Sequence, residues 1–406
     1  MIDLGQAGDA DQAGDTGALS LPLLPTTVVG SHGIPGWLHV ARGAVTRGEF
    51  GPADLEELYA DATKLAIDDQ ERAGIDVLSD GEMRRLHFVQ GFYGRLHGLE
   101  PLPVARKLGS PGYDMVPQFR AVERITLRAP DDVDDARLSR AEGLGIAEEF
   151  TFARTLTSRP LKVTSPGPLM FALQIAPDGG PYEDRFEIAE DLAKIVNTEL
   201  HRAVDAGARI VQLDDPSFSF HRSGSDAVFT PAAAAPDEGR GPGGNGGREG
   251  EPEAPPAAEL ARLYNLAVAG LRERGVKLLL HLCFGNFHAR PRTARSYRTL
   301  FPGVLDARCD QFVLEFSGRE MAEADLWREL EIDRELGAGV VDIKSFYPET
   351  PEQVAVRIRR LLESVAVEKL WLNPDCGFNH SARWVCAAKL NALVQGARIV
   401  RQEVTS

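Results

Sequence analysis

The sequence predicts an α/β fold, a single (β/α)8 TIM barrel in which eight parallel strands close into a ring surrounded by helices. Short apolar runs rich in β-branched residues alternate with amphipathic helical stretches along the 406 residues, which indicates parallel strands joined by helical crossovers. We find eight such runs, and a polar or metal-binding residue follows each of them. A barrel collects all of these strand ends on one face. The alternative, an open doubly wound sheet, would gather only the ends near its switch point.

The predicted strands are short and aliphatic, as expected for buried parallel strands. They cover Thr27–Gly30, Asp76–Ser79, Leu161–Thr164, Arg209–Leu213, Val276–Leu280, Gln311–Phe316, Gly339–Ile343 and Lys369–Leu372. Among the helices, Pro52 and Pro351 suit a first helical turn, and Asp184 suits an N-cap. The predicted helices cover Pro52–Ala73, Asp184–Ala206, Ala257–Arg274, Met321–Leu336, Pro351–Val365 and Ser381–Ala397.

Three segments fall outside this alternation. Residues 84–160 form one connection that is too long for a single helix, so we expect additional elements there, over the barrel mouth. Residues 231–256 consist mainly of Gly, Pro and acidic residues, which predicts a disordered surface insertion without a further role. Residues 1–20 are acidic and rich in Gly and Ala, which predicts a disordered tail before one catalytic domain, 21–406.

Composition excludes several classes of function. The net charge of −15 repels nucleic acid and anionic membranes, and no basic stripe interrupts it. No apolar run approaches the roughly 18 to 20 residues needed to span a bilayer. The N-terminus lacks the basic start and apolar centre of a signal peptide, so we expect a cytoplasmic protein. Its four cysteines are therefore more suited to metal binding or catalysis than to disulfides.

Four side chains at strand ends predict a zinc site. His281 and Cys283 in LLLHLCFGN are two residues apart, and alternate residues of an extended chain share one face. Cys376 in NPDCGFN and Glu315 in FVLEFSG follow two other predicted strands. Two sulfurs, one nitrogen and one carboxylate oxygen form a tetrahedral set that suits Zn²⁺.

Each of these residues also has a structural interpretation. His281 alone could be a hydrogen-bonded histidine, either cysteine a small buried residue, and Glu315 half of an ion pair. Their combination at strand ends of one barrel favours the metal, whereas Cys309 and Cys386 have no such context and are interpreted as structural. Zinc with two thiolates is electron-rich, which favours activation of an incoming thiol over hydrolysis.

Seven segments together resemble a known family. They are TTVVGSH, DVLSDGEMRR, VQLDDPSF, HLCFGN, VLEFSGRE, DIKS and WLNPDCGF, spread over residues 25–400. With these segments the chain resembles the catalytic domain of cobalamin-independent methionine synthase, within the wider group of zinc-dependent thiol methyltransferases. The resemblance implies a cytoplasmic methyltransferase of methionine biosynthesis that methylates homocysteine.

The resemblance also implies roles for individual residues. His281, Cys283, Glu315 and Cys376 would be the zinc ligands. Gly30 and Ser31 would hold the carboxylate of the amino acid, for which a loop of free N–H groups is suited. Glu82 and Asp214 would bind its ammonium group. Without the resemblance, Glu82 would be read as a surface ion-pair partner of Arg84 or Arg85, and Asp214 as part of the turn before Pro216.

The chain departs from the family pattern at three points. It lacks the N-terminal duplicate barrel of the long form and so resembles the short, core form. Lys344 in DIKSF stands where the family has a proton-donating His, so it is a catalytic candidate that could donate a proton, steady a developing anion, or only pair with Asp342. TSPGPLMFALQ lacks the folate-stacking Trp, so the methyl donor stays open between a folate, a corrinoid carried by a partner protein and another activated methyl compound.

Other functions fit the same predicted site. An enzyme similar to epoxyalkane:coenzyme M transferase would use a sulfonate thiol, which has no ammonium group for Glu82 and Asp214. A thiol transferase of specialised metabolism fits as well. A non-catalytic barrel that stores zinc or senses thiols would not need an exchangeable carboxylate ligand beside an amino-acid pocket.

Overall fold

In a computed structural model the described residues are 20–85, 89–106, 115–130, 142–177, 180–217, 257–285 and 295–406. The predicted insertion at 231–256 and residues 1–19 of the predicted tail lie outside them. Within the described residues the central sheet is parallel, in the order β3-β5-β6-β7-β8-β9. Its strands are β3 (Val163–Pro166), β5 (Ile210–Asp214), β6 (Lys277–Leu282), β7 (Gln311–Glu315), β8 (Glu335–Val341) and β9 (Leu370–Pro374).

Two short extended segments close this sheet into a ring. Parallel bridges join Thr26 to Leu372 of β9, Thr27 to Val77, and Leu78 to Leu161, just before β3. The predicted barrel is therefore confirmed, although the first two predicted strands are reduced to these bridges. One apolar cluster contains a residue from each of six different segments of the ring. These residues are Val29, Val77, Ile210, Leu279, Val313 and Trp371.

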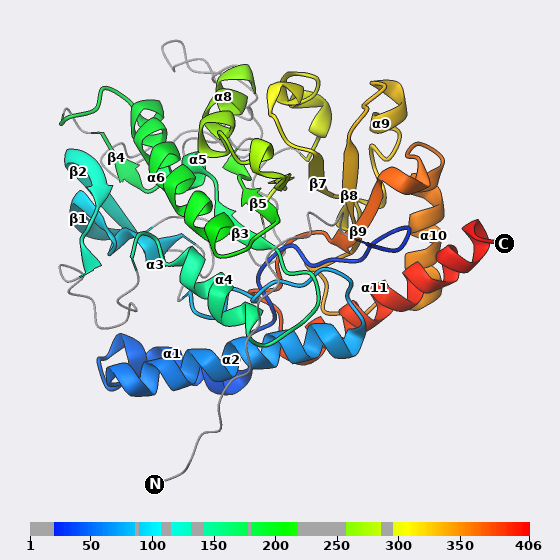
Figure 1. Cartoon of the computed structure of the whole chain (residues 1–406), viewed down its shortest axis with the longest axis horizontal. Coiled ribbons are helices and arrows are strands. Elements are labelled where there is room, and N and C mark those ends of the chain that lie inside the picture. The colour runs from blue at the N-terminus through cyan, green and yellow to red at the C-terminus, as the bar shows by residue number, and fades with distance from the viewer. Residues whose placement is uncertain are drawn as a thin grey trace, which may run out of the picture.

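The helices begin where the sequence provides caps. Thr350 accepts a hydrogen bond from the N–H of Gln353 at 3.3 Å, and Asp184 accepts from Phe186 and Glu187 at 2.8 and 3.0 Å. In Figure 1, α1 and α2 run along one side of the barrel, with α11 beside α2. The longer helices are α1 (Gly36–Thr46), α2 (Pro52–Ala73), α4 (Ile146–Arg154), α6 (Arg185–Asp205), α8 (Ala257–Ala267), α10 (Pro351–Leu362) and α11 (Arg383–Val404).

The long connection carries additional elements, as predicted. The short helix α3 (Gln90–Tyr93) lies there, and β1 (Leu96–Arg106) and β2 (Met115–Leu127) pair as an antiparallel ribbon. The next connection, after β3, contains the short helix α5 (Pro168–Ala172) and β4 (Ile175–Ala176), which adds to β2 in parallel. The ribbon extends beyond the barrel beside α6 (Figure 1).

The predicted helix Met321–Leu336 is wrong. Met321, Glu323 and Glu331 all have positive φ, between 50° and 63°, a region that an α-helix of L-residues does not use. Only the short α9 (Leu326–Glu329) forms there, and β8 begins at Glu335 instead of the predicted Gly339. The predicted helix Ala257–Arg274 is likewise too long, because α8 ends at Ala267.

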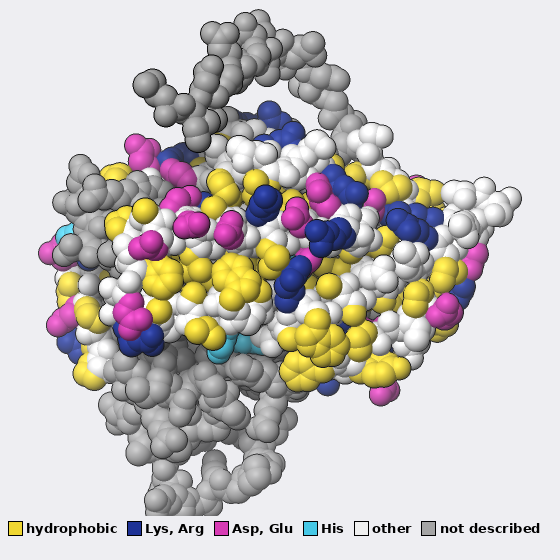
Figure 2. Space-filling model, turned by 90° about the horizontal axis from the view of Figure 1, so that it is seen from below, with side chains coloured by type: hydrophobic (Ala, Val, Ile, Leu, Met, Phe, Trp, Pro, Cys, Tyr) yellow, Lys and Arg dark blue, Asp and Glu magenta, His cyan; other side chains and the backbone are white. Residues whose placement is uncertain are grey.

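The surface of the described residues agrees with the composition. None of their helices has the length and apolar character needed to span a membrane. Figure 2 shows the molecule from below the view of Figure 1. On that face acidic and basic side chains are intermingled with apolar ones, and no continuous basic stripe is seen there.

Candidate metal and substrate site

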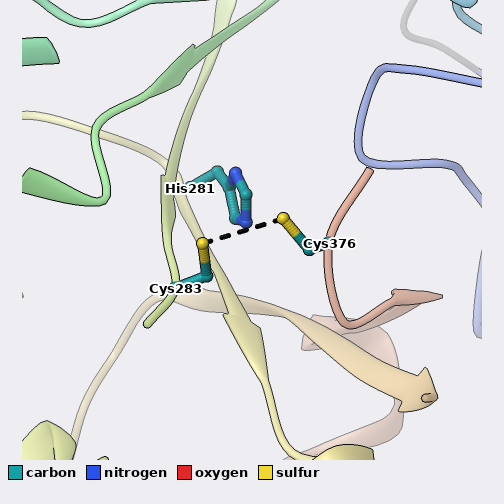
Figure 3. Close-up of side chains that lie close together, drawn as sticks. All are labelled: His281, Cys283 and Cys376. Atoms are coloured by element: carbon teal, nitrogen blue, oxygen red, sulfur yellow. Dashed lines mark hydrogen bonds between the residues drawn. The ribbon is translucent and has the colours of Figure 1, made fainter. Parts of the chain in front are cut away.

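Three predicted zinc ligands meet at the carboxyl ends of β6 and β9. His281 is the fifth residue of β6, Cys283 directly follows that strand, and Cys376 lies two residues after β9. One ligand atom from each residue lies within 4.8 Å of the other two. Figure 3 shows all three side chains converging, with the two Sγ atoms 3.7 Å apart. The short strands and tight loops therefore bring together residues 93 positions apart.

The imidazole of His281 is oriented by Asp214. Its Nδ1 lies 2.8 Å from Oδ1 of Asp214, and both side chains are buried. A carboxylate only accepts hydrogen bonds, so Nδ1 carries the hydrogen. Nε2 of His281 is buried and has no hydrogen-bond partner among the described residues. A free ring nitrogen opposite a carboxylate-bound one is the arrangement of a metal-binding histidine.

Glu315, the fourth predicted ligand, lies at the end of β7 with no exposed surface. Its Oε2 accepts a hydrogen bond from Nζ of Lys344 at 2.7 Å. Its Oε1 is buried and has no partner among the described residues. Glu315 is outside the three-residue cluster, but it raises the pKa of Cys283 by charge repulsion. The unpartnered Nε2 of His281 and the two sulfurs make a donor set that fits Zn²⁺, and the unpartnered Oε1 of Glu315 is a candidate fourth donor outside that cluster.

The cysteines differ in pKa because they share a hydrogen bond. The hydrogen bond between the two sulfurs and the nearby His281 lower the pKa of Cys376 well below its usual value, although burial opposes this. The same hydrogen bond and burial raise the pKa of Cys283. Burial opposes a charge on His281, yet Asp214 and Cys376 raise its pKa to about 10. A cation that binds here must therefore displace protons.

Glu82 is one of the two residues predicted to bind an ammonium group. It has φ 55° and is buried; its Oε1 accepts from Oγ1 of Thr164 at 2.9 Å and lies 3.3 Å from a guanidinium nitrogen of Arg85. Burial raises the pKa of Glu82 to about 7, with Arg85 opposing and Asp214 contributing. A Cβ on Gly30 would lie 2.5 Å from this Oε1, so the close approach requires glycine.

Ser31 lies in the loop after the first extended segment of the ring, the one with Thr26 and Thr27, and links this loop to the loop that carries Cys376. Its hydroxyl accepts from the N–H of Asn379 at 3.2 Å, and its carbonyl accepts from the N–H of Phe378 at 2.8 Å. Ser31, Glu82, Arg85 and Asn379 help to line one small cavity. Of the four predicted substrate-binding residues, Ser31 and Glu82 line this cavity, whereas Gly30 and Asp214 are not among its lining residues.

Asp375 is a site residue that the sequence reasoning missed. Its carboxylate accepts from the N–H groups of Phe316, Ser317 and Gly318 at 3.0, 2.9 and 2.5 Å. It therefore ties the loop after Glu315 to the loop before Cys376. The adjacent cysteine in NPDCGF was the only sequence signal for this role.

Lys162 was also missed, since a lysine near a strand start is ordinarily exposed. Here it is 2% exposed and donates to Val28 and to Gln212. Burial lowers its pKa to about 7, while Asp214 and Glu82 oppose that shift.

A second cluster anchors the loop beyond Ser31. His32 Nε2 lies 3.1 Å from Oδ2 of Asp69 in α2, and Arg383 of α11 binds the same carboxylate. Cys386, buried in α11, lies 3.3 Å from Nδ1 of His32. Burial opposes the charge on His32, but Cys386 and Asp69 raise its pKa to about 9. The cluster fixes the loop between two helices.

Residues 24–227 and 257–399 match the family described as cobalamin-independent synthase, catalytic domain. A curated methionine synthase from Saccharolobus solfataricus is 31% identical over 95% of this chain and 97% of its own length. One from Sulfurisphaera tokodaii is 30% identical, over 95% and 94%. The solved structure of a B12-independent methionine synthase from Shewanella sp. W3-18-1, in complex with selenomethionine, is 25% identical with TM-score 0.68, covering 94% and 99%.

Proposed function

Because the chain belongs to the cobalamin-independent synthase family, we propose that it transfers a methyl group to the sulfur of homocysteine at a zinc site, giving methionine. The observation that supports this most directly is the convergence of His281, Cys283 and Cys376, with Nδ1 of His281 already bound to Asp214. His281 Nε2, the two Sγ atoms and Glu315 Oε1 are the atoms proposed to hold the ion.

Zinc held by two thiolates would lower the pKa of a substrate thiol, so that a thiolate is present at neutral pH. The residues around it would position the amino acid. We assign its carboxylate to the loop of Gly30 and Ser31 and its ammonium group to Glu82. Oδ1 of Asp214 serves His281 and Gln212, so the other oxygen of Asp214 is assigned to the ammonium group.

Lys344 is assigned a positioning role. Nζ binds Glu315, whereas Asp342 accepts a hydrogen bond from the backbone N–H of Lys344. Burial opposes the charge on Lys344, but Glu315, Asp375 and Cys376 raise its pKa. A lysine that keeps its proton steadies neighbouring anions and is a poor proton donor at neutral pH. Lys344 is therefore proposed to position Glu315 and not to donate the proton that the family His would donate.

The reaction itself needs little from the chain beyond orientation. The thiol loses its proton, the new S–C bond forms, and the bond between the methyl carbon and its donor breaks, with the electron pair leaving on the donor. The methyl donor belongs to the class of activated methyl compounds. The folate and corrinoid alternatives predicted from the sequence both belong to this class.

Calorimetric titration of the zinc-loaded protein with homocysteine, in two buffers of different ionisation enthalpy, tests the proposal. We expect binding with release of about one proton per site, since the thiol must ionise. Coenzyme M serves as the comparison because it is a thiol without an ammonium group. Binding of coenzyme M with no response to homocysteine would replace the proposed substrate by a sulfonate thiol. Zinc that stays bound without any response to thiols would favour a non-catalytic barrel.

A further inference from the structure

A chain of buried hydrogen bonds connects Lys162 to His281. Nζ of Lys162 lies 2.6 Å from Oε1 of Gln212, and Nε2 of Gln212 lies 2.7 Å from Oδ1 of Asp214. The same Oδ1 lies 2.8 Å from Nδ1 of His281. All four residues are at most 3% exposed, so water does not replace any of these contacts. The chain runs from Lys162, the residue before β3, through Gln212 and Asp214 of β5 to His281 of β6.

The hydrogen-bonding capacity of each group determines the direction of the chain. A charged lysine has donors and no acceptor, and Lys162 donates to the carbonyl of Val28 and to Gln212. Both protons of the Gln212 amide are used, one on the carbonyl of Val29 at 2.7 Å and one on Asp214. The amide therefore has a single orientation, with its oxygen toward Lys162 and its nitrogen toward Asp214.

We propose that Lys162 and Gln212 are positioning residues for the metal site: they hold Asp214 so that His281 keeps its hydrogen on Nδ1 and presents Nε2 to the ion. Among the described residues, the side-chain hydrogen bonds of Lys162 and Gln212 go to Val28, Val29, Asp214 and each other, and to none of the proposed ligands. Their effect passes through one carboxylate, whose position decides which nitrogen of the imidazole is free. This inference rests on the proposed zinc site and adds two residues that set its affinity.

Loss of Lys162 removes the group that holds the Gln212 oxygen. The amide oxygen is then buried without a donor, and Gln212 is held only through its nitrogen, on Val29 and Asp214. Asp214 is fixed less firmly as a result, and so is the partner that sets the tautomer and ring orientation of His281. The predicted consequence is a weaker metal site in a protein whose fold is intact.

The test is the affinity for Zn²⁺ and for Co²⁺, measured by competition with a chromophoric chelator, together with the absorption spectrum of the Co²⁺ protein. Wild type is compared with Lys162→Met, Gln212→Met and the double variant. Lys277→Met is the control, because Lys277 pairs with Glu335 at 2.6 Å at the opposite end of the barrel. We expect each single variant to bind metal about 10-fold more weakly and the control to bind like wild type.

The metal affinity of the double variant, compared with that of each single variant, shows whether Lys162 and Gln212 act through one chain or independently. If Lys162 acts through Gln212, the double variant loses little more affinity than either single one, whereas independent effects multiply. Wild-type affinity in both single variants overturns the inference while leaving the zinc site in place. Failure of wild type to bind metal overturns the proposed function itself. Circular dichroism reports folding, and if Lys162→Met does not fold, Gln212→Met alone decides between these results.

Discussion

Lys344 and Glu315 form a buried ion pair at the edge of the candidate metal site, with Nζ 2.7 Å from Oε2. Glu315 is the last residue of β7 and Lys344 follows β8, so neighbouring strands of the barrel bring them together. The pair occupies one carboxylate oxygen and leaves Oε1 without a partner among the described residues. The same glutamate thus fits both of its predicted interpretations, an ion-pair partner and a metal ligand.

Replacement of Lys344 should therefore have different effects with and without metal. In metal-free protein, Lys344→Met leaves a buried carboxylate uncompensated and should lower the free energy of unfolding by about 3 kcal/mol. Bound zinc would supply positive charge next to Glu315, so the loss should be smaller in the loaded protein. Urea unfolding of both forms measures the difference.

Lys389→Met is the matched control for that experiment. Lys389 binds Glu349 at 2.8 Å, both side chains are buried, and their hydrogen bonds among the described residues involve none of the proposed ligands. Its replacement should destabilise the metal-free and loaded forms equally. If Lys344→Met behaves in the same way, its pairing with Glu315 is structural only.

Loss of a proposed ligand should abolish metal binding. His281→Ala and Cys376→Ser each remove one converging donor, and we expect both variants to lose bound zinc and methyl transfer together. Elemental analysis after gel filtration gives the zinc content. Cys309→Ser is the control, since Cys309 is buried beside Arg334, 3.6 Å from its guanidinium, and should keep its metal. Near-full zinc in either ligand variant would refute the assignment.

The binding of methionine should depend on the ionisation of Glu82. Its pKa is raised to about 7, so the carboxyl becomes neutral as the pH falls below 7 and no longer pairs with an ammonium group. Affinity should therefore rise between pH 6 and pH 8, by about tenfold over the whole range. Methionine has no thiol proton, so its titration isolates this effect from thiol ionisation.

Glu82→Gln supplies the comparison for that pH series. The amide is neutral throughout, so calorimetry should find weaker methionine binding at pH 8 and little change with pH. Zinc content should stay at the wild-type level, because Glu82 contacts Thr164 and Arg85 and none of the proposed ligands. An unchanged pH dependence in this variant would remove Glu82 from the ammonium site.

Gly30→Ala should disturb the same carboxylate by steric contact. The added methyl group would lie 2.5 Å from Oε1 and 3.2 Å from Cδ of Glu82, so the buried side chain must move. Overpacking of this kind costs about 1–3 kcal/mol, and methionine affinity should fall about tenfold. Gly36→Ala is the control, since an added Cβ there meets no atom within 4 Å. Equal affinities for the two variants would show that Gly30 is not confined by Glu82.

Parts of the fold were predictable because their signals are local. A proline in the first turn and a side-chain cap lie within a few residues of the helix that they begin, as for α2 at Pro52 and α10 at Thr350. The predicted helix after β7 failed for the opposite reason. Its residues have helical propensity, but positive φ at Met321 and Glu331 breaks the segment into turns.

The sequence by itself determined the barrel, through the alternation of its strands and helices, and the proposed metal donors, through their places at strand ends. Spacing of two residues in a strand is enough to put His281 and Cys283 on one face. Only the tertiary structure decided what surrounds them. The contacts of Asp214 with His281, of Lys344 with Glu315 and of Lys162 with Gln212 each join residues in or next to different strands of the ring. Such pairs follow from strand order and register, which no local pattern in a sequence specifies.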